Sequence, residues 1–144
     1  RGYDNGQQNE GRVLVYAGGP AGPSADAVWA AESNNPYALF GYSVAAAGDV
    51  NADGFADLVV GADGFSGAFL SEGRAYLYLG SPGGLEPQPA WTVAGGQADA
   101  FLGRSVCGAG DVNGDGLADL LVGADGFDGR YANQGRALLF PGAR

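Results

Sequence analysis

The sequence predicts an all-β protein made of antiparallel four-stranded sheets, arranged as the blades of a partial β-propeller. The chain contains an internal repeat: residues 11–72 align with 73–134 without a gap, and 28 of the 62 positions are identical. Each repeat has four short β-rich runs, and 28 of the 144 residues are glycine, which suits many tight turns. No window shows the apolar periodicity of a helix of about 10–12 residues. About two repeats give too few blades to close a ring.

Four classes of strand are expected, and each recurs at the same place in the next repeat. In the order of the repeat, they fall at 40–48 and 102–110, at 57–62 and 119–124, at 11–16, 73–78 and 135–140, and at 27–31 and 90–94. The third class opens with Gly-Arg and is apolar on both faces, which is typical of a strand buried between packed sheets. Segments rich in Gly, Pro, Asn and Asp separate the strands and predict loops.

The composition excludes several classes of function. The chain has no His and no Lys, so a Ser-His-Asp triad, a His-ligated zinc site, a Schiff-base lysine and a P-loop lysine are impossible. With a single cysteine there is no intrachain disulfide. The net charge of −9 argues against nucleic acid or an anionic membrane as the main partner. We therefore expect a protein that is not an enzyme and has no membrane-inserted segment.

Two acidic loops carry the strongest chemical signal. They read D-V-N-A-D-G-F-A-D at 49–57 and D-V-N-G-D-G-L-A-D at 111–119, with oxygen-bearing side chains at positions 1, 3, 5 and 9 and glycine at position 6. Alternate side chains of a curled loop point inward and can surround a hard cation, and the carbonyl of position 7 can join them. The candidate ligands are Asp49, Asn51, Asp53, Phe55 and Asp57 in the first loop, and Asp111, Asn113, Asp115, Leu117 and Asp119 in the second.

The loops begin like an EF-hand but end differently. Position 12 is Val60 or Val122 rather than a glutamate, and strands rather than helices flank the loop, so the aspartate at position 9 has to close the site. All-oxygen ligands with three carboxylates favour Ca²⁺ over Mg²⁺, and two bound Ca²⁺ would reduce the net charge from −9 to about −5. The alternative is a cluster of Asx turns without metal.

The combined motif F-G-x-S-V, G-D-V-N-x-D-G-x-x-D-L-x-V-G-A and G-R resembles the FG-GAP repeat, which builds the β-propeller of integrin α subunits and of many secreted bacterial proteins. The resemblance covers essentially the whole chain. It implies Ca²⁺ at both loops, through the ten residues named above. It also implies the end of one blade at 1–39, a complete blade at 40–94 and the start of a third at 95–144. Family propellers usually have seven blades.

The sequence departs from the family pattern at two places. Leu102 replaces the phenylalanine found at Phe40, which keeps an apolar plug. Asp63 and Asp125 replace the final proline of the motif, and we expect them to be solvated turn residues rather than to contact the metal loop.

Other recurring residues have both structural and functional interpretations. Trp29 and Trp91 could stack on a sugar, but their fixed place in the repeat favours packing. The aromatic residues of the third strand, Tyr16, Tyr76, Tyr78 and Phe140, are expected in the core. Cys107 is expected to be a small buried side chain. The repeated arginines Arg12, Arg74 and Arg136 could bind an anion, but salt bridges to neighbouring acidic loops are the favoured interpretation.

These observations predict a calcium-binding propeller module of a secreted or cell-surface protein, with a structural, adhesive or protein-binding role. A glycan-binding propeller and a non-catalytic part of a larger extracellular enzyme are the alternatives. Because the chain begins and ends within a repeat, we expect a processed chain or a piece of a longer one. Its expected partners are further blades of that chain or further copies of itself.

Overall fold

The computed structural model describes residues 2–143, and within them it contains strands, turns and no helix, hence none that could span a membrane. The predicted all-β fold is confirmed. The strands are β1 Arg12–Val15, β2 Trp29–Glu32, β3 Ser43–Gly48, β4 Asp57–Ala62, β5 Arg74–Tyr78, β6 Gly80–Ser81, β7 Gly84–Leu85, β8 Trp91–Ala94, β9 Leu102–Gly110, β10 Asp119–Ala124 and β11 Arg136–Phe140. Arg1 and Arg144, the ends of the expected outer segments, lie outside the described residues.

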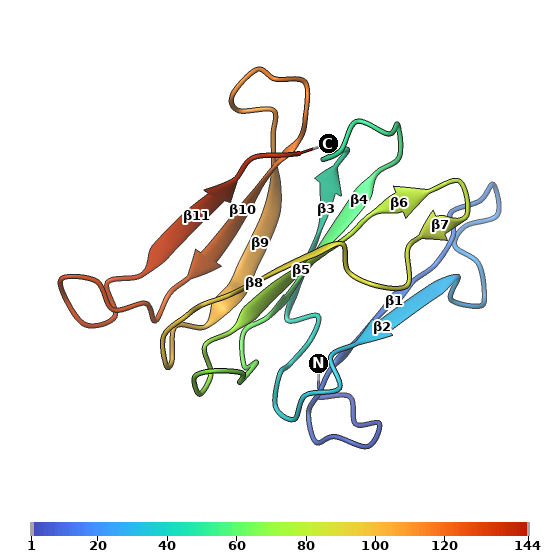
Figure 1. Ribbon diagram of the computed structural model, residues 1–144. Helices are drawn as coiled ribbons and strands as arrows, with labels where there is room; N and C mark the ends of the chain where they lie inside the picture. Colours follow the sequence, from blue (N-terminus) through green and yellow to red (C-terminus); the bar gives the residue numbers. More distant parts are fainter. Residues whose placement is uncertain (1, 144) are drawn as a thin grey trace.

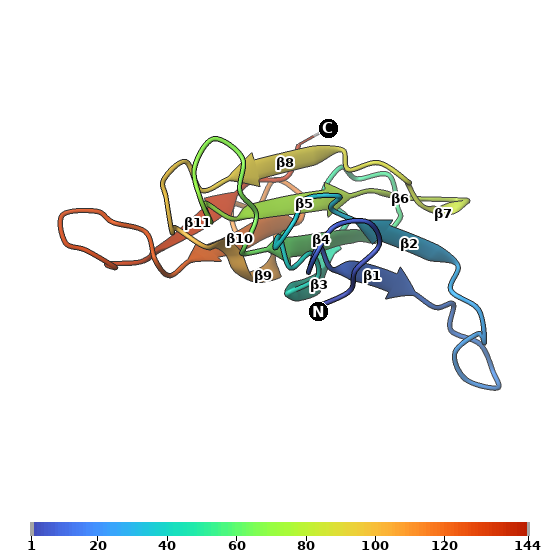
Figure 2. The ribbon, with the colours of Figure 1, turned by 90° about the horizontal axis from the view of Figure 1, so that it is seen from below.

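Three antiparallel sheets lie side by side (Figure 1). The two-stranded sheet β1-β2 is followed by the four-stranded sheet β3-β4-β5-β8 and then by the three-stranded sheet β9-β10-β11. The view from below shows the central sheet between the other two (Figure 2). Four antiparallel strands make up a blade of a β-propeller, and the central sheet has that number while its two neighbours have fewer.

The strands follow the repeat closely, with some differences from the expected bounds. β3 starts at Ser43 and its equivalent β9 at Leu102, although the backbone is left-handed at Leu39 (φ 56°) and Gly41 (φ 82°) as it is at the equivalent residues of the second repeat. The pairing of β3 with β4 contains a register shift between Ala46 and Gly48. The short hairpin β6-β7, which the sequence pattern did not indicate, occupies the Gly-rich segment between β5 and β8.

Apolar faces join the first sheet to the central one. Val13 and Trp29 pack against Val60, Tyr76 and Tyr78, and all five are at most 9% exposed. Trp29 meets Tyr78 edge-on, with ring centroids 4.8 Å apart. Burial raises the pKa of Tyr78 to about 12, since ionisation would place a charge in this apolar layer. Full burial of such side chains stabilises a fold by about 1.5–3 kcal/mol each.

The opposite face of the central sheet packs on the third sheet. Val59 and Leu77 lie against Leu120, while Ala75 lies against Leu102 and neighbours in β10. Phe40 and Leu102, the repeat-equivalent plug residues, are both fully buried, so the exchange of Phe for Leu keeps the apolar plug. Trp91 packs edge-on against Phe140, as Trp29 packs on Tyr78 in the preceding interface.

Two residues expected to be buried are exposed. Tyr16 is 45% exposed, although its equivalent Tyr78 is buried, because no sheet formed by residues 2–143 packs on that face. Cys107 is exposed because it shares an outward face of the third sheet with its pairing partner Leu121. The equivalent face of the central sheet, which includes Val59, is covered by the third sheet. Both predictions were wrong, because either side chain would be buried only if a further sheet packed on its face.

The repeated arginines stack on aromatic rings and form no ion pair with any of residues 2–143, so the prediction of salt bridges was wrong. Within the described residues, the guanidinium carbon of Arg74 lies 3.8 Å from the centre of the Phe65 ring, and that of Arg136 lies 3.8 Å from Phe127. Arg12 lies over Tyr3 at 5.2 Å. The three aromatic partners themselves occupy equivalent positions of successive repeats. Each pair thus ties the start of a third strand to the turn before it through cation–π contact.

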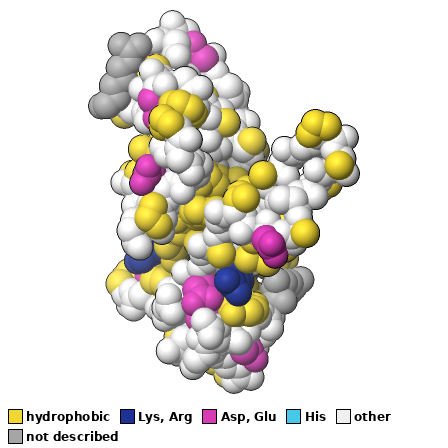
Figure 3. All heavy atoms as spheres, turned by 90° about the vertical axis from the view of Figure 1, so that its right-hand side faces the viewer, with side chains coloured by type: hydrophobic (Ala, Val, Ile, Leu, Met, Phe, Trp, Pro, Cys, Tyr) yellow, Lys and Arg dark blue, Asp and Glu magenta, His cyan; other side chains and the backbone are white. Residues whose placement is uncertain are grey.

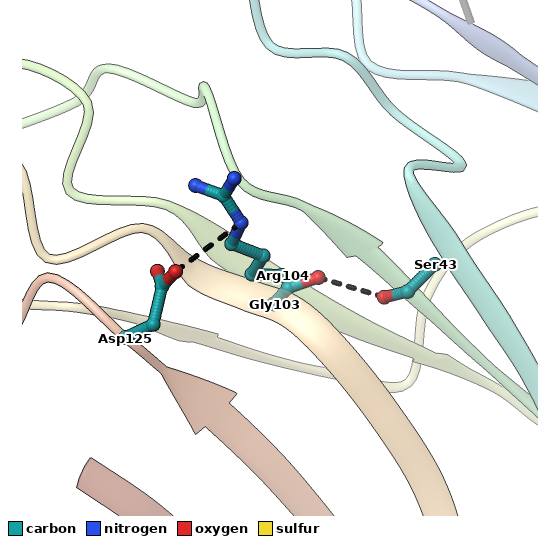
Figure 4. Close-up of polar contacts among 4 residues, drawn as sticks. All are labelled: Ser43, Gly103, Arg104 and Asp125. Carbon is teal, nitrogen blue, oxygen red and sulfur yellow. Dashed lines mark hydrogen bonds and ion pairs between the residues drawn. The ribbon is translucent and has the colours of Figure 1, made fainter. Parts of the chain in front are cut away.

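The two aspartates that replace the family proline differ in their surroundings. Asp63 is only 5% exposed, so the expectation of a solvated turn residue was wrong there. Asp125 is exposed and forms an ion pair with Arg104, 3.3 Å from nitrogen to oxygen (Figure 4). Because both partners are largely solvated, this pair contributes at most about 1 kcal/mol.

Glycine permits a close approach between the central and third sheets. The carbonyl of Gly103 in β9 lies against Gly61 in β4, and a Cβ at Gly61 would overlap that oxygen. The same carbonyl accepts a 2.7 Å hydrogen bond from the Ser43 hydroxyl (Figure 4). The repeat-equivalent of Gly61 is Gly123, where an added Cβ would meet the hydroxyl of Ser105, a small group that can rotate away.

We predict that Gly61→Ala destabilises the fold by about 2 kcal/mol or more, because the backbone of β9 has to move. Gly123→Ala is the matched control and should cost clearly less. Urea denaturation followed by circular dichroism measures both. Equal costs for the two substitutions would contradict the tight packing of β4 on β9.

Candidate metal centre

The two acidic loops lie at the same end of their sheets, the upper end in Figure 1. Loop 49–57 joins β3 to β4, and loop 111–119 joins β9 to β10. A short antiparallel pair therefore frames each loop, which fixes the positions of its first and last residues. In the first loop, Gly48 pairs with Asp57 across the ladder, and in the second Gly110 pairs with Asp119.

The first loop curls so that three predicted ligands come together. The amide of Asp53 donates to Oδ1 of Asp49 and to Oδ1 of Asn51, at 3.1 Å in both cases. The side-chain amide of Asn51 donates to Oδ2 of Asp53 at 2.8 Å. The second oxygen of Asp49 accepts from Gly54 at 2.9 Å. Side chains at positions 1, 3 and 5 thus point toward the interior of one turn.

The second loop repeats this geometry. Asp115 donates to Asp111 at 3.1 Å and to Asn113 at 2.9 Å, and Gly116 donates to Asp111 at 2.8 Å. These backbone amides, with that of Gly116 dominant, hold the pKa of Asp111 below its ordinary value, and partial desolvation opposes them. The second loop adds a bond from Gly114 to Asp111 at 2.7 Å, but the other bonds recur in both loops, which indicates that the sequence motif itself determines this shape.

The aspartates at position 9 have a different role in the structure. Asp57 is 2% exposed and Asp119 is fully buried. One oxygen of Asp57 accepts from Val50 and the other from Gly80, both at 2.8 Å. Asp119 does the same with Val112 at 2.8 Å and Gly142 at 2.9 Å. Each carboxylate therefore fastens the start of its loop to the chain that follows the third strand.

The donor set is chemically suited to a hard cation. Each loop has three carboxylates and one side-chain carbonyl, which are the oxygen ligands that Ca²⁺ prefers. Over residues 2–143, however, no group of three or more acidic or cysteine side chains has the arrangement of a formed metal site. The oxygens are turned toward the loop's own amides. A cation would compete with those amides for oxygens that already converge.

Sequence reasoning missed the glycines that complete these loops. Gly80 and Gly142 donate the second hydrogen bond to Asp57 and Asp119, and a Cβ at Gly142 would lie 2.7 Å from the carbonyl oxygens of Val50 and Ala118. A Cβ at Gly80 would overlap the carbonyl oxygen of Ala56. The signal was available, because both glycines follow a third strand closely and occupy equivalent positions of successive repeats.

A family model and individual proteins of similar sequence were compared with the chain, and the two comparisons agree with each other. The family model described as FG-GAP repeat matches residues 40–78 and 102–140. The chain is 33% identical over 147 aligned residues to integrin alpha-5 of Xenopus laevis, covering 99% of this chain and 14% of that protein. It is 39% identical over 127 residues to integrin alpha-E of Mus musculus, covering 80% and 10%. The chain thus spans a small part of these relatives.

We predict that Asp57→Ala destabilises the protein by about 2 kcal/mol or more even in EDTA, because it leaves two backbone amides without their charged acceptor. Asp53→Ala, at an exposed position of the same loop, serves as control and should cost less than half as much under the same conditions. Chemical denaturation in EDTA measures both. If the two substitutions had equal effects, Asp57 would not be the fastening residue described above.

Proposed function

The chain belongs to the FG-GAP repeat family, and from this membership we propose that it is a calcium-stabilised segment of a β-propeller in an extracellular or cell-surface protein. Its role is structural, adhesive or protein-binding. Two Ca²⁺ are bound, one by Asp49, Asn51, Asp53, the Phe55 carbonyl and Asp57, the other by Asp111, Asn113, Asp115, the Leu117 carbonyl and Asp119. The blade boundaries are those expected from the sequence, 1–39, 40–94 and 95–144.

The duplicated loop geometry is the observation that carries this proposal. Clustered carboxylates repel one another, and in the absence of a cation only backbone and side-chain amides offset that repulsion. Asp49 and Asp111 already hold both oxygens inward, and the aspartates at position 9 anchor the loops from below. Extracellular Ca²⁺ is near millimolar, so that sites of modest affinity are filled there.

A role in catalysis is not part of the proposal. The sequence has no histidine that could activate a nucleophile, and the lone Cys107 lies on an exposed sheet face. Glycan binding through Trp29 lacks support as well. Trp29 is 9% exposed, and its ring nitrogen donates to the carbonyl of Glu86. The face of that ring is therefore not presented to a sugar.

Further propeller blades are the proposed partners of the two outer sheets. On the N-terminal side, the exposed residues Leu14, Tyr16 and Val28 belong to or flank β1 and β2. Figure 3 views the molecule from this side and shows hydrophobic side chains gathered across the middle of the face. On the other side, Leu121 and Leu139 are exposed where their equivalents Val59 and Leu77 are buried. These blades come from a longer chain or from other copies.

We predict that Ca²⁺ raises the melting temperature and that Mg²⁺ at the same concentration has little effect, because only a ligand that binds the native state preferentially shifts unfolding. Differential scanning fluorimetry after removal of metal with EDTA measures this. An identical melting curve with Ca²⁺ and with EDTA would refute the proposed calcium role.

We also predict that the isolated chain associates as its concentration rises, since apolar faces and strand edges seek cover. Leu121→Gln combined with Leu139→Gln should shift it toward monomer, whereas Leu70→Gln, on a loop away from these faces, should not. Light scattering follows the mass. A monodisperse 14.4 kDa monomer that melts cooperatively would argue against this use of the outer faces.

A further inference from the structure

The two acidic loops differ at the residue that follows their asparagine. The first loop has Asn51-Ala52 and the second has Asn113-Gly114. The backbone is the same, because Ala52 (φ 58°) and Gly114 (φ 79°) both have the left-handed conformation. The asparagine side chains also bind alike, since each donates to Oδ2 of the aspartate two residues later at 2.8 Å. The loops are thus a natural pair that differs here by one methyl group, by the exposure of the asparagine, which is partly buried in the first loop, and by a 2.7 Å hydrogen bond from the Gly114 amide to Oδ1 of Asp111.

We propose that Asn113 is a site of spontaneous deamidation, which Asn51 resists. The backbone nitrogen of Gly114 attacks Cγ of Asn113 and loses its proton to solvent base. The N–Cγ bond forms, the Cγ–Nδ2 bond breaks, and ammonia leaves. Water then opens the resulting succinimide at one of its two carbonyls. The products are aspartate or isoaspartate plus one ammonia for each water consumed.

Glycine makes this cyclisation accessible in the second loop. Attack requires the residue after asparagine to rotate so that its nitrogen reaches Cγ, and a Cβ hinders that rotation. Nothing lies within 4 Å of the place where a Cβ would stand at Gly114, so this segment has room to move. Asn113 is exposed, and the hydrogen bonds that must break lie at the surface: the bond from its side-chain amide to Asp115 and the 2.7 Å bond from the Gly114 amide to Oδ1 of Asp111.

Calcium should control the rate, a part of the inference that rests on the proposed function. A cation held by Oδ1 of Asn113 fixes the side-chain carbonyl in its ligand position, away from the nitrogen of Gly114. Asn5-Gly6 provides an internal reference, because it lies in an exposed N-terminal loop outside both acidic loops. Deamidation at Asn5 should therefore not respond to Ca²⁺.

The two products would affect the second loop differently. Aspartate at 113 keeps an oxygen at position 3, which calcium loops accept as readily as asparagine. Isoaspartate instead adds a backbone atom between positions 3 and 4. That shift separates Asp111 from Asp115 and Asp119, and so removes the second site. The first loop would keep its geometry.

Incubation of the full chain at mildly alkaline pH in EDTA, followed by peptide mapping with mass spectrometry, tests the proposal. Deamidation at Asn113 should exceed that at Asn51 by about tenfold or more, in line with the freedom of glycine. Gly114→Ala should reduce Asn113 to the level of Asn51, and the reciprocal Ala52→Gly should make Asn51 labile. Ala52 itself shows that the loop accepts alanine at this position.

Equal deamidation rates at Asn113 and Asn51, or a deamidation rate at Asn113 that Gly114→Ala does not change, would overturn the proposal that Asn113 is a deamidation site. Saturating Ca²⁺ should slow deamidation at Asn113 and leave the deamidation rate at Asn5 unchanged. If Asn113 is labile and Ca²⁺ raises the melting temperature without slowing deamidation, the calcium control is overturned and the site stands. If Ca²⁺ changes neither the melting temperature nor the rate, the proposed calcium role fails while the labile site is retained.

Discussion

Face-to-face packing of consecutive sheets is the interaction on which the rest of the structure depends. The central sheet has no polar face: Val60, Tyr76 and Tyr78 cover one side, and Val59 and Leu77 cover the other. Such a sheet cannot be stable alone in water, so every sheet needs a neighbour on each side. Within residues 2–143, each of the two outer sheets has such a neighbour on one side only, so its other apolar face is exposed.

The same packing positions the acidic loops. Because the sheets are related by one repeated register, the loops after β3 and β9 emerge at the same end, with the glycines after the third strands close to them. Asp57 and Asp119 then join the apolar layer to the polar loop through buried carboxylates. Loop geometry is therefore coupled to blade packing, and a cation that stabilises a loop would also stabilise the blade beneath it.

The strand positions and the positions of the acidic loops could be predicted because a repeat constrains them twice. The repeated tryptophans, Trp29 and Trp91, locate the fourth strand in two repeats. The repeated Gly-Arg pairs locate the third strand in three. The errors arose where a residue's environment depends on another sheet. Cys107 and Tyr16 are equivalent to buried positions of the central repeat, but no sheet formed by residues 2–143 covers the faces on which they lie. The partner of Arg74 was mistaken because charge suggests a carboxylate, whereas the turn brings Phe65 over the guanidinium.

The count of bound Ca²⁺ tests most directly the claim that two equivalent loops serve as cation sites. Isothermal titration calorimetry of the metal-free chain should give two ions per chain. Asp53→Ala and Asp115→Ala should each leave one, and the double variant should leave none. A chain that binds no Ca²⁺, or one whose stoichiometry does not change with either substitution, would contradict the account.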